Sequence, residues 1–107
     1  MSFQVRITDA ASAEVNEAAA WWAEHRSLEQ ALRWLREIHE HIGTLGDGPE
    51  RRSLARESSR FAFEVRESRF GVGRRVTHRV LFRIAGDVVE VLAVRHVAQR
   101  PLRRGEL

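Results

Sequence analysis

The spacing of apolar residues changes its period twice along the chain, and this order limits the folds that the chain can adopt. Near the start, Phe3, Val5 and Ile7 alternate with polar residues, which is the period of a half-buried strand. Two stretches with apolar residues every three or four positions follow, at about residues 9–25 and 28–45. Later in the chain the period returns to two. This order predicts an α+β domain.

The two helical stretches carry start signals and lie almost next to each other. Thr8 or Asp9 can cap the first helix, and the run from Ser27 to Gln30 matches a capping box for the second. Because so few residues separate them, we expect an antiparallel helical hairpin with facing apolar stripes. Its three tryptophans are expected mainly in the core, the first of them least so: Trp21, Trp22 and Trp34.

Three further strands are expected in the second half of the chain. They cover about residues 61–68, 75–84 and 88–94, and short turns rich in glycine separate them. The apolar side chains of the first of these strands are Phe61, Phe63 and Val65. Residues 50–59 stay unassigned, and residues 97–107 are expected to form a polar tail.

These strands predict a three-stranded antiparallel meander with the helical hairpin on one face. The N-terminal strand joins this sheet, and a crossover through two helices leaves it free to pair with a neighbour other than the second strand. In the strand over residues 75–84, apolar side chains alternate with a mainly basic set. One sheet face, carrying Arg66, Arg79 and Arg83, is therefore expected to remain open.

The size and composition of the chain exclude several classes of protein. At 107 residues the chain is expected to form one domain, spanning residues 1–107. It has no cysteine, which rules out disulfides, thiolate zinc sites and cysteine nucleophiles and favours a reducing compartment. We find no signal peptide or membrane-spanning stretch, so we expect a cytoplasmic protein that needs no membrane and no cofactor.

Charge is divided unevenly between the two halves of the chain. All 18 basic residues are arginine; residues 1–50 contain 4 of them against 9 acidic residues, and residues 51–107 contain 14 against 6. Guanidinium groups bind carboxylates and phosphates with two parallel hydrogen bonds, so the second half is suited to a polyanionic partner. The alternative is a general preference for arginine over lysine at the surface, for solubility.

A few residues could carry chemistry. His96 beside Arg95, at the end of the last strand, could transfer protons while arginines hold a phosphate, and Glu64 could act as a base. Together with Arg66 and Arg79, these side chains form a possible phosphodiester-cleaving set; the alternative is an ordinary strand end. His39 and His41 are two residues apart on a helix, so we expect solvated histidines and no metal site.

The order and spacing of these motifs resemble the RelE/ParE superfamily of toxins from type II toxin-antitoxin modules, often called plasmid stabilisation proteins. The resemblance covers nearly the whole chain and rests on the opening strand Val5 to Thr8, the helix with Trp21 and Trp22, the strand His78 to Ile84, the Gly86-Asp87 turn and the strand Val89 to His96. It implies a small bacterial toxin that a co-encoded antitoxin with an acidic, partly disordered segment neutralises. Operator DNA would then be bound only through the antitoxin.

The superfamily contains two kinds of toxin, and the resemblance leaves both open. RelE-like members are ribosome-dependent mRNA endonucleases, and here only Arg79 matches their basic set, with Glu64 where a cation is expected. ParE-like members lack that set and inhibit DNA gyrase, which is the function we favour. The residues expected to bind the target or the antitoxin are Arg66, Arg69, Arg75, Arg79, Arg83 and Arg95. If the chain is an endonuclease instead, the expected catalytic residues are Glu64, Arg79 and His96; a member without toxicity that still binds its antitoxin is the third possibility.

Overall fold

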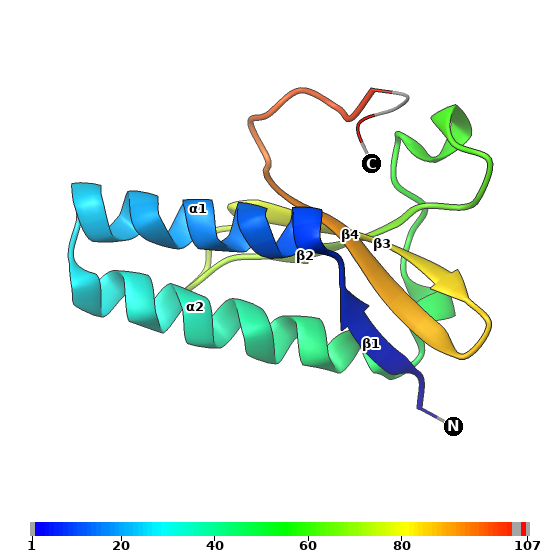
Figure 1. Cartoon of the computed structure of the whole chain (residues 1–107), viewed down its shortest axis with the longest axis horizontal. Coiled ribbons are helices and arrows are strands. Elements are labelled where there is room, and N and C mark those ends of the chain that lie inside the picture. The colour runs from blue at the N-terminus through cyan, green and yellow to red at the C-terminus, as the bar shows by residue number, and fades with distance from the viewer. Residues whose placement is uncertain (1, 104–105, 107) are drawn as a thin grey trace.

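The computed structural model, which describes residues 2–103 and 106, contains a four-stranded sheet with two helices on one face (Figure 1). The strands are β1 (Gln4–Ile7), β2 (Arg66–Phe70), β3 (His78–Ala85) and β4 (Val88–His96), and the helices are α1 (Asp9–His25) and α2 (Leu28–Gly43). Single 3-10 turns occupy Thr44–Gly46, Pro49–Arg51 and Ser58–Arg60. The α+β class and the element order predicted from the sequence are confirmed.

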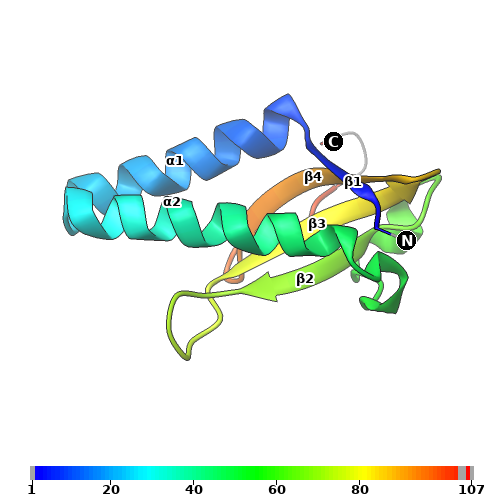
Figure 2. The same cartoon turned by 90° about the horizontal axis from the view of Figure 1, so that it is seen from below.

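The sheet has the order β1-β4-β3-β2 and is mixed. β2, β3 and β4 form the expected antiparallel meander, whereas β1 lies parallel to β4, with Val5 opposite Val89 and Ile7 opposite Val91. The first strand thus pairs with the last strand of the chain rather than with the next one. Figure 2 shows the two helices running side by side along the same face of the sheet.

Both helices begin where their capping residues predict. The Thr8 hydroxyl oxygen accepts a hydrogen bond from the Ala11 amide at 3.1 Å, and the Ser27 hydroxyl oxygen accepts one from the Gln30 amide at the same distance. Each bond satisfies an amide that has no partner within its helix. α2 ends at Gly43, and a 3-10 turn takes the chain to Gly46.

The larger apolar core lies between the helices and the sheet. Trp34 is 1% exposed and packs edge-on to Phe70. Val80 and Phe82 of β3 are fully buried in the same cluster. The expectation that the tryptophans are core residues is confirmed for Trp34 alone, since Trp22 is half-buried and Trp21 is 47% exposed.

The opposite sheet face differs from the expected open surface, because a second apolar cluster covers it. β2 begins at Arg66, so the strand predicted over residues 61–68 starts too early. Phe61 and Phe63 belong instead to an irregular segment that packs on this cluster. The buried residues of the second apolar cluster come from the segment before β2, from β3, from β4 and from the segment after β4: Ala55, Val65, Leu81, Leu92, Ala93 and Leu102.

A β-bulge explains how β4 can supply apolar side chains to both faces. Leu81 lies opposite Ala93 and Phe82 opposite Val91, so Leu92 is an extra residue in β4. The bulge places both Leu92 and Ala93 in the second cluster, while Val91 and Val94 remain in the first. The expectation that β4 is covered on both sides is confirmed.

The segment after β4 is not simply a polar tail, because Leu102 is 2% exposed within the second cluster. No helix in the described part of the chain is long and apolar enough to cross a membrane.

Candidate functional site

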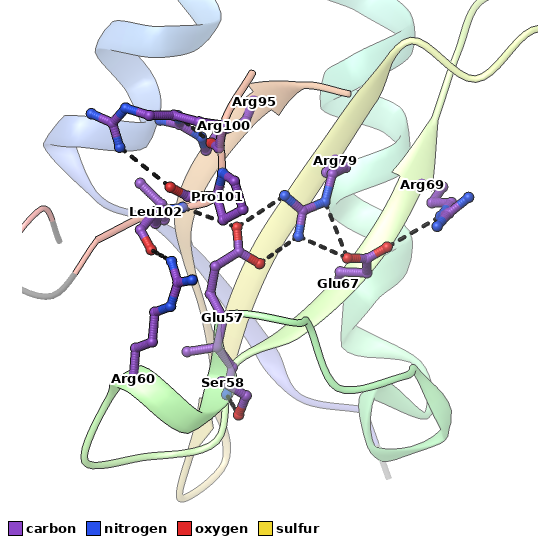
Figure 3. A network of polar contacts seen from close by, with 11 residues as sticks. Glu57, Ser58, Arg60, Glu67, Arg69, Arg79, Arg95, Arg100, Pro101 and Leu102 are labelled. Atoms are coloured by element: carbon purple, nitrogen blue, oxygen red, sulfur yellow. Dashed lines mark hydrogen bonds and ion pairs between the residues drawn. The ribbon is translucent and has the colours of Figure 1, made fainter. Parts of the chain in front are cut away.

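Arg79 lies at the centre of a charged network on the sheet face opposite the helices (Figure 3). Its Nε donates to Glu67 at 3.1 Å, its Nη1 donates to Glu57 at 3.0 Å, and its Nη2 donates to Glu57 at 2.6 Å and to Glu67 at 2.9 Å. The side chain of Arg79 is 6% exposed and that of Glu57 is fully buried. Two carboxylates thus occupy the donor fork of one buried guanidinium group.

Glu57 also fixes the segment after β4. Its Oε2 accepts a hydrogen bond from the Leu102 amide at 3.1 Å, and Arg60 donates to the Leu102 carbonyl at 2.8 Å. Burial by itself would raise the pKa of Glu57, but the hydrogen bonds from Arg79 and from the Leu102 amide lower it to about 2. The hydrogen bonds to Glu57 and, secondarily, to Glu67 raise the pKa of Arg79 although burial alone would lower it. The pair is therefore fully ionised at neutral pH.

Of the six arginines predicted to bind a partner, two are buried in internal contacts. Arg79 is 5% exposed, and Arg95 is 8% exposed. Arg95 donates to the Arg100 carbonyl at 2.9 Å and lies 3.7 Å from a Glu14 oxygen. The sheet face expected to remain open carries Arg79, and that expectation is wrong for Arg79, because Glu57 and the segments around the second apolar cluster cover it. Arg95 was predicted to bind a partner, and its guanidinium group is instead held by the Arg100 carbonyl and lies near Glu14.

The other four arginines remain at least partly accessible. Arg69 and Arg75 are exposed. Arg66 is half-buried and donates to the Arg52 carbonyl at 2.7 Å, and half-buried Arg83 donates to Glu90 at 2.9 Å. These four side chains are the accessible part of the predicted arginine set.

The three residues predicted for an endonuclease do not come together. Arg79 and Arg95 are opposite each other in the β3–β4 register, and His78 and His96 form the next pair, so the side chains of Arg79 and His96 lie on opposite faces of the sheet. Glu64 precedes β2, and its side chain is 69% exposed and lies 3.4 Å from Arg66. No cluster of three or more metal-ligating side chains occurs among the residues that the structure describes.

A cleft of about 530 Å³ separates α1 from the adjoining ends of β3 and β4, and we call it the apolar cleft. Trp21 and Trp22 line its α1 wall, while Val76 and Val97 line the opposite wall. Trp21, Val76 and Val97 are three of the exposed large apolar side chains of the chain. Sequence reasoning missed this cleft, although the exposure expected for Trp21 hinted at it.

Two histidines, His41 in α2 and His78 in β3, are shielded from solvent. His41, expected in solvent, is half-buried and hydrogen-bonded to the Ser68 hydroxyl at 2.7 Å, and burial lowers its pKa. His78 lies under Trp34, with 5.1 Å between the ring centroids, and next to the His96 ring. Burial, and secondarily the charge of His96, lower the pKa of His78 from 6.5 to about 4.

We expect the free energy of unfolding to fall as the pH drops from 6.5 towards 4. In this range the unfolded chain binds a proton at His78 that the folded chain does not, with a slope of at most about 1.4 kcal/mol per pH unit for this residue. His41 acts in the same direction. Urea unfolding at several pH values in this range should show that the free energy of unfolding of His78→Leu changes less steeply with pH than that of the wild type. The control is His39→Leu, the same replacement at an exposed position. An unchanged slope for His78→Leu would contradict the prediction.

Comparisons with known proteins relate the chain to toxin-antitoxin systems. A family model described as the ParE toxin of the type II toxin-antitoxin system parDE matches residues 5–101. The fold is similar to a structure of the chromosomal ParDE system from P. aeruginosa, with a TM-score of 0.71 and 20% identity over 90% of this chain and 97% of that one. It is also similar to the toxin-antitoxin complex RelBE2 from Mycobacterium tuberculosis, with a TM-score of 0.57 and 25% identity over 92% of this chain and 95% of that one. No curated protein matches the chain.

Proposed function

The chain belongs to the ParE toxin family of type II toxin-antitoxin systems, and from this membership we propose that it acts by binding DNA gyrase and not by cutting mRNA. Membership of the RelE/ParE superfamily, predicted from the sequence motifs, is confirmed by the family match and by the two similar structures.

The state of Arg79 is the observation that carries this proposal. In an endonuclease, this arginine would have to hold a scissile phosphate, with an acid or a base close by. Here Glu57 and Glu67 already occupy its guanidinium group, and His96 lies on the other face of the sheet. This arrangement favours a structural role for Arg79 and supports inhibition by protein binding.

We assign the contact with the target to the accessible arginines: Arg66, Arg69, Arg75 and Arg83. Surface charges of this kind speed the encounter with an acidic protein surface and make it sensitive to salt. The cognate antitoxin is the second partner, and operator DNA would be bound only through it. We place apolar side chains of the antitoxin in the apolar cleft, where they would cover Trp21, Val76 and Val97.

The test separates gyrase inhibition from RNA cleavage with two sets of variants. We expect the purified chain to inhibit DNA supercoiling by gyrase and to leave mRNA on ribosomes intact. His96→Gln combined with Glu64→Ala should leave this inhibition largely intact, because His96 lies outside the assigned contact and Glu64 touches only one of its four arginines, Arg66, from an exposed position. Arg69→Glu combined with Arg75→Glu should weaken it by about tenfold or more, since two favourable charges become unfavourable.

Three outcomes would contradict the proposal. Cleavage of mRNA that disappears in the double variant at Glu64 and His96 would identify an endonuclease. Equal inhibition of gyrase by the variant at Arg69 and Arg75 would exclude the assigned contact. Induction in a bacterial host with no growth defect would identify a member that has lost its toxicity and still binds its antitoxin.

A further inference from the structure

Two leucines near the start of α2 are open to solvent, although the sequence predicts that the apolar residues of this helix face the hairpin. Leu28 is 67% exposed and Leu32 is 55% exposed. Leu35, at the next turn, is half-buried at the margin of the larger apolar core. The start of α2 lies at the hairpin end of the helices, which reaches past the strands (Figure 1). The apolar surface of α2 is therefore wider than the surface that the rest of the described chain covers.

The three leucines lie on one side of α2, and we call them the leucine seam. They are spaced four and three residues apart, and exposed His39 continues the series after four more. Alternating steps of four and three residues are the spacing of coiled coils, in which a second helix covers the seam. Because its buried residues already hold α2 in helical form, pairing with a second helix does not include the cost of forming it.

Two opposite charges flank the leucine seam. Glu29 and Arg36 each directly follow a leucine of the seam, so both lie on the same side of it. Both are exposed, and neither forms an ion pair with a residue that the structure describes. They are separated by about 10 Å along the helix axis, which is too far for them to pair with each other. Arg33 and Glu37, only one turn apart, do pair at 2.8 Å.

A second copy of α2 in antiparallel orientation would cover the seam and neutralise both charges. When Leu32 faces Leu35 of the second copy, the two seams meet along their length. In this register Glu29 and Arg36 of the second copy are about 3 Å apart along the helix axis, and the two-fold axis repeats the pair. A parallel arrangement would place the same two charges about 10 Å apart along the axis and leave them unpaired.

We propose that two copies of this chain form a symmetric dimer in which the α2 helices pack antiparallel through their leucine seams. Two ion pairs between Glu29 and Arg36 fix the register and the orientation. A two-fold dimer needs a surface that is complementary to itself, and opposite charges beside one apolar seam meet this condition. No residue of this contact is assigned above to the target or to the antitoxin, so the inference goes beyond the proposed function and does not depend on it.

Sedimentation equilibrium of the purified full chain tests the inference at concentrations from about 1 µM to about 1 mM. We expect the average mass to rise from that of a monomer to that of a dimer as the concentration increases. The contact is short, so we expect a weak dimer. Leu32→Glu should weaken self-association by about tenfold or more, because it places a charge in the middle of the apolar seam.

Charge reversal is the sharper test, because it distinguishes this register from non-specific association. Glu29→Arg alone and Arg36→Glu alone should each self-associate about tenfold more weakly than the wild type, since like charges then meet at both ion pairs. An equimolar mixture of the two variants should form a mixed dimer with about the affinity of the wild type, because both pairs then join opposite charges again.

The matched control pair is Glu50→Arg and Arg74→Glu, which makes the same charge changes at two exposed residues outside α2. Each control should self-associate nearly as tightly as the wild type, and mixing the two should bring no gain. Thermal unfolding of all variants, at a concentration where the wild type is a monomer, checks that each is folded.

Each other outcome would overturn the inference. A chain that stays monomeric up to about 1 mM forms no such dimer. A dimer that Leu32→Glu leaves intact uses another surface. If the mixed variants at Glu29 and Arg36 associate no more tightly than either one alone, the antiparallel register is wrong. Assemblies larger than a dimer would exclude a closed two-fold contact. Because this assay contains neither gyrase nor RNA, its result does not depend on what the toxin acts on.

Discussion

Replacing Arg79 with alanine is expected to lower the free energy of unfolding by about 3–5 kcal/mol. The substitution leaves the fully buried carboxylate of Glu57 without its cation and removes two of the hydrogen bonds that Glu67 accepts. An unpaired buried charge costs far more than the pair itself contributes, because no opposite charge and no bulk water then compensates it, and the remaining hydrogen bond from the Leu102 amide is not enough to do so. Such a loss is a large part of the total stability of a small domain.

The measurement is urea unfolding of the wild type and of Arg79→Ala at neutral pH, with Arg69→Ala as the control. Arg69 contacts Glu67 from an exposed position, so its removal should cost no more than about 1 kcal/mol. Combining Arg79→Ala with Glu57→Gln should cost less than the sum of the two single changes, because the double variant no longer buries an unpaired charge.

The opposite pattern would support a catalytic role. If Arg79→Ala were as stable as the wild type yet no longer toxic, Arg79 would be available to a substrate, and the structural role assigned to it would be wrong. The experiment therefore tests both the fold and the proposed mode of action through one residue.

The helical half of the fold could be predicted because its signals are local. Thr8 and Ser27 mark the starts of the two helices, and a helix cap needs only residues within one turn. The turn around Gly86 and the apolar run in β4 indicate a hairpin for the same reason. The order of the elements follows from the change of period along the chain, and the family resemblance rests on that order.

The predictions that were wrong concern residues whose neighbours are distant in sequence. Phe61 and Phe63 alternate as in a strand, yet they pack on a cluster completed by Leu102, about forty residues later. Arg79 sits in a regular polar-apolar alternation, and only the fold brings Glu57 within bonding distance of it. A buried ion pair and an exposed arginine have the same sequence pattern, so the expected open basic face could not be distinguished from a covered one.

Replacing Leu102 with alanine is expected to lower the free energy of unfolding by about 2–5 kcal/mol, the range for truncating a buried leucine. A polar tail, as the sequence suggested, would tolerate the change, whereas here the side chain is 2% exposed and fills the second apolar cluster. The matched control is Leu28→Ala, because Leu28 is 67% exposed and its removal should have little effect. Urea unfolding of both variants measures the difference.

The result also bears on the buried charges, because the Leu102 amide donates to Glu57. If the tail detaches when the leucine is shortened, Glu57 loses one of the hydrogen bonds that lower its pKa, although Arg79 remains. We then expect the Leu102→Ala variant to lose less stability on acidification below pH 4.5 than the wild type does, since less of its stability depends on an ionised Glu57.

Equal stability of Leu102→Ala and the wild type would show that the tail contributes nothing to the fold, and the second apolar cluster would have to be stable without it.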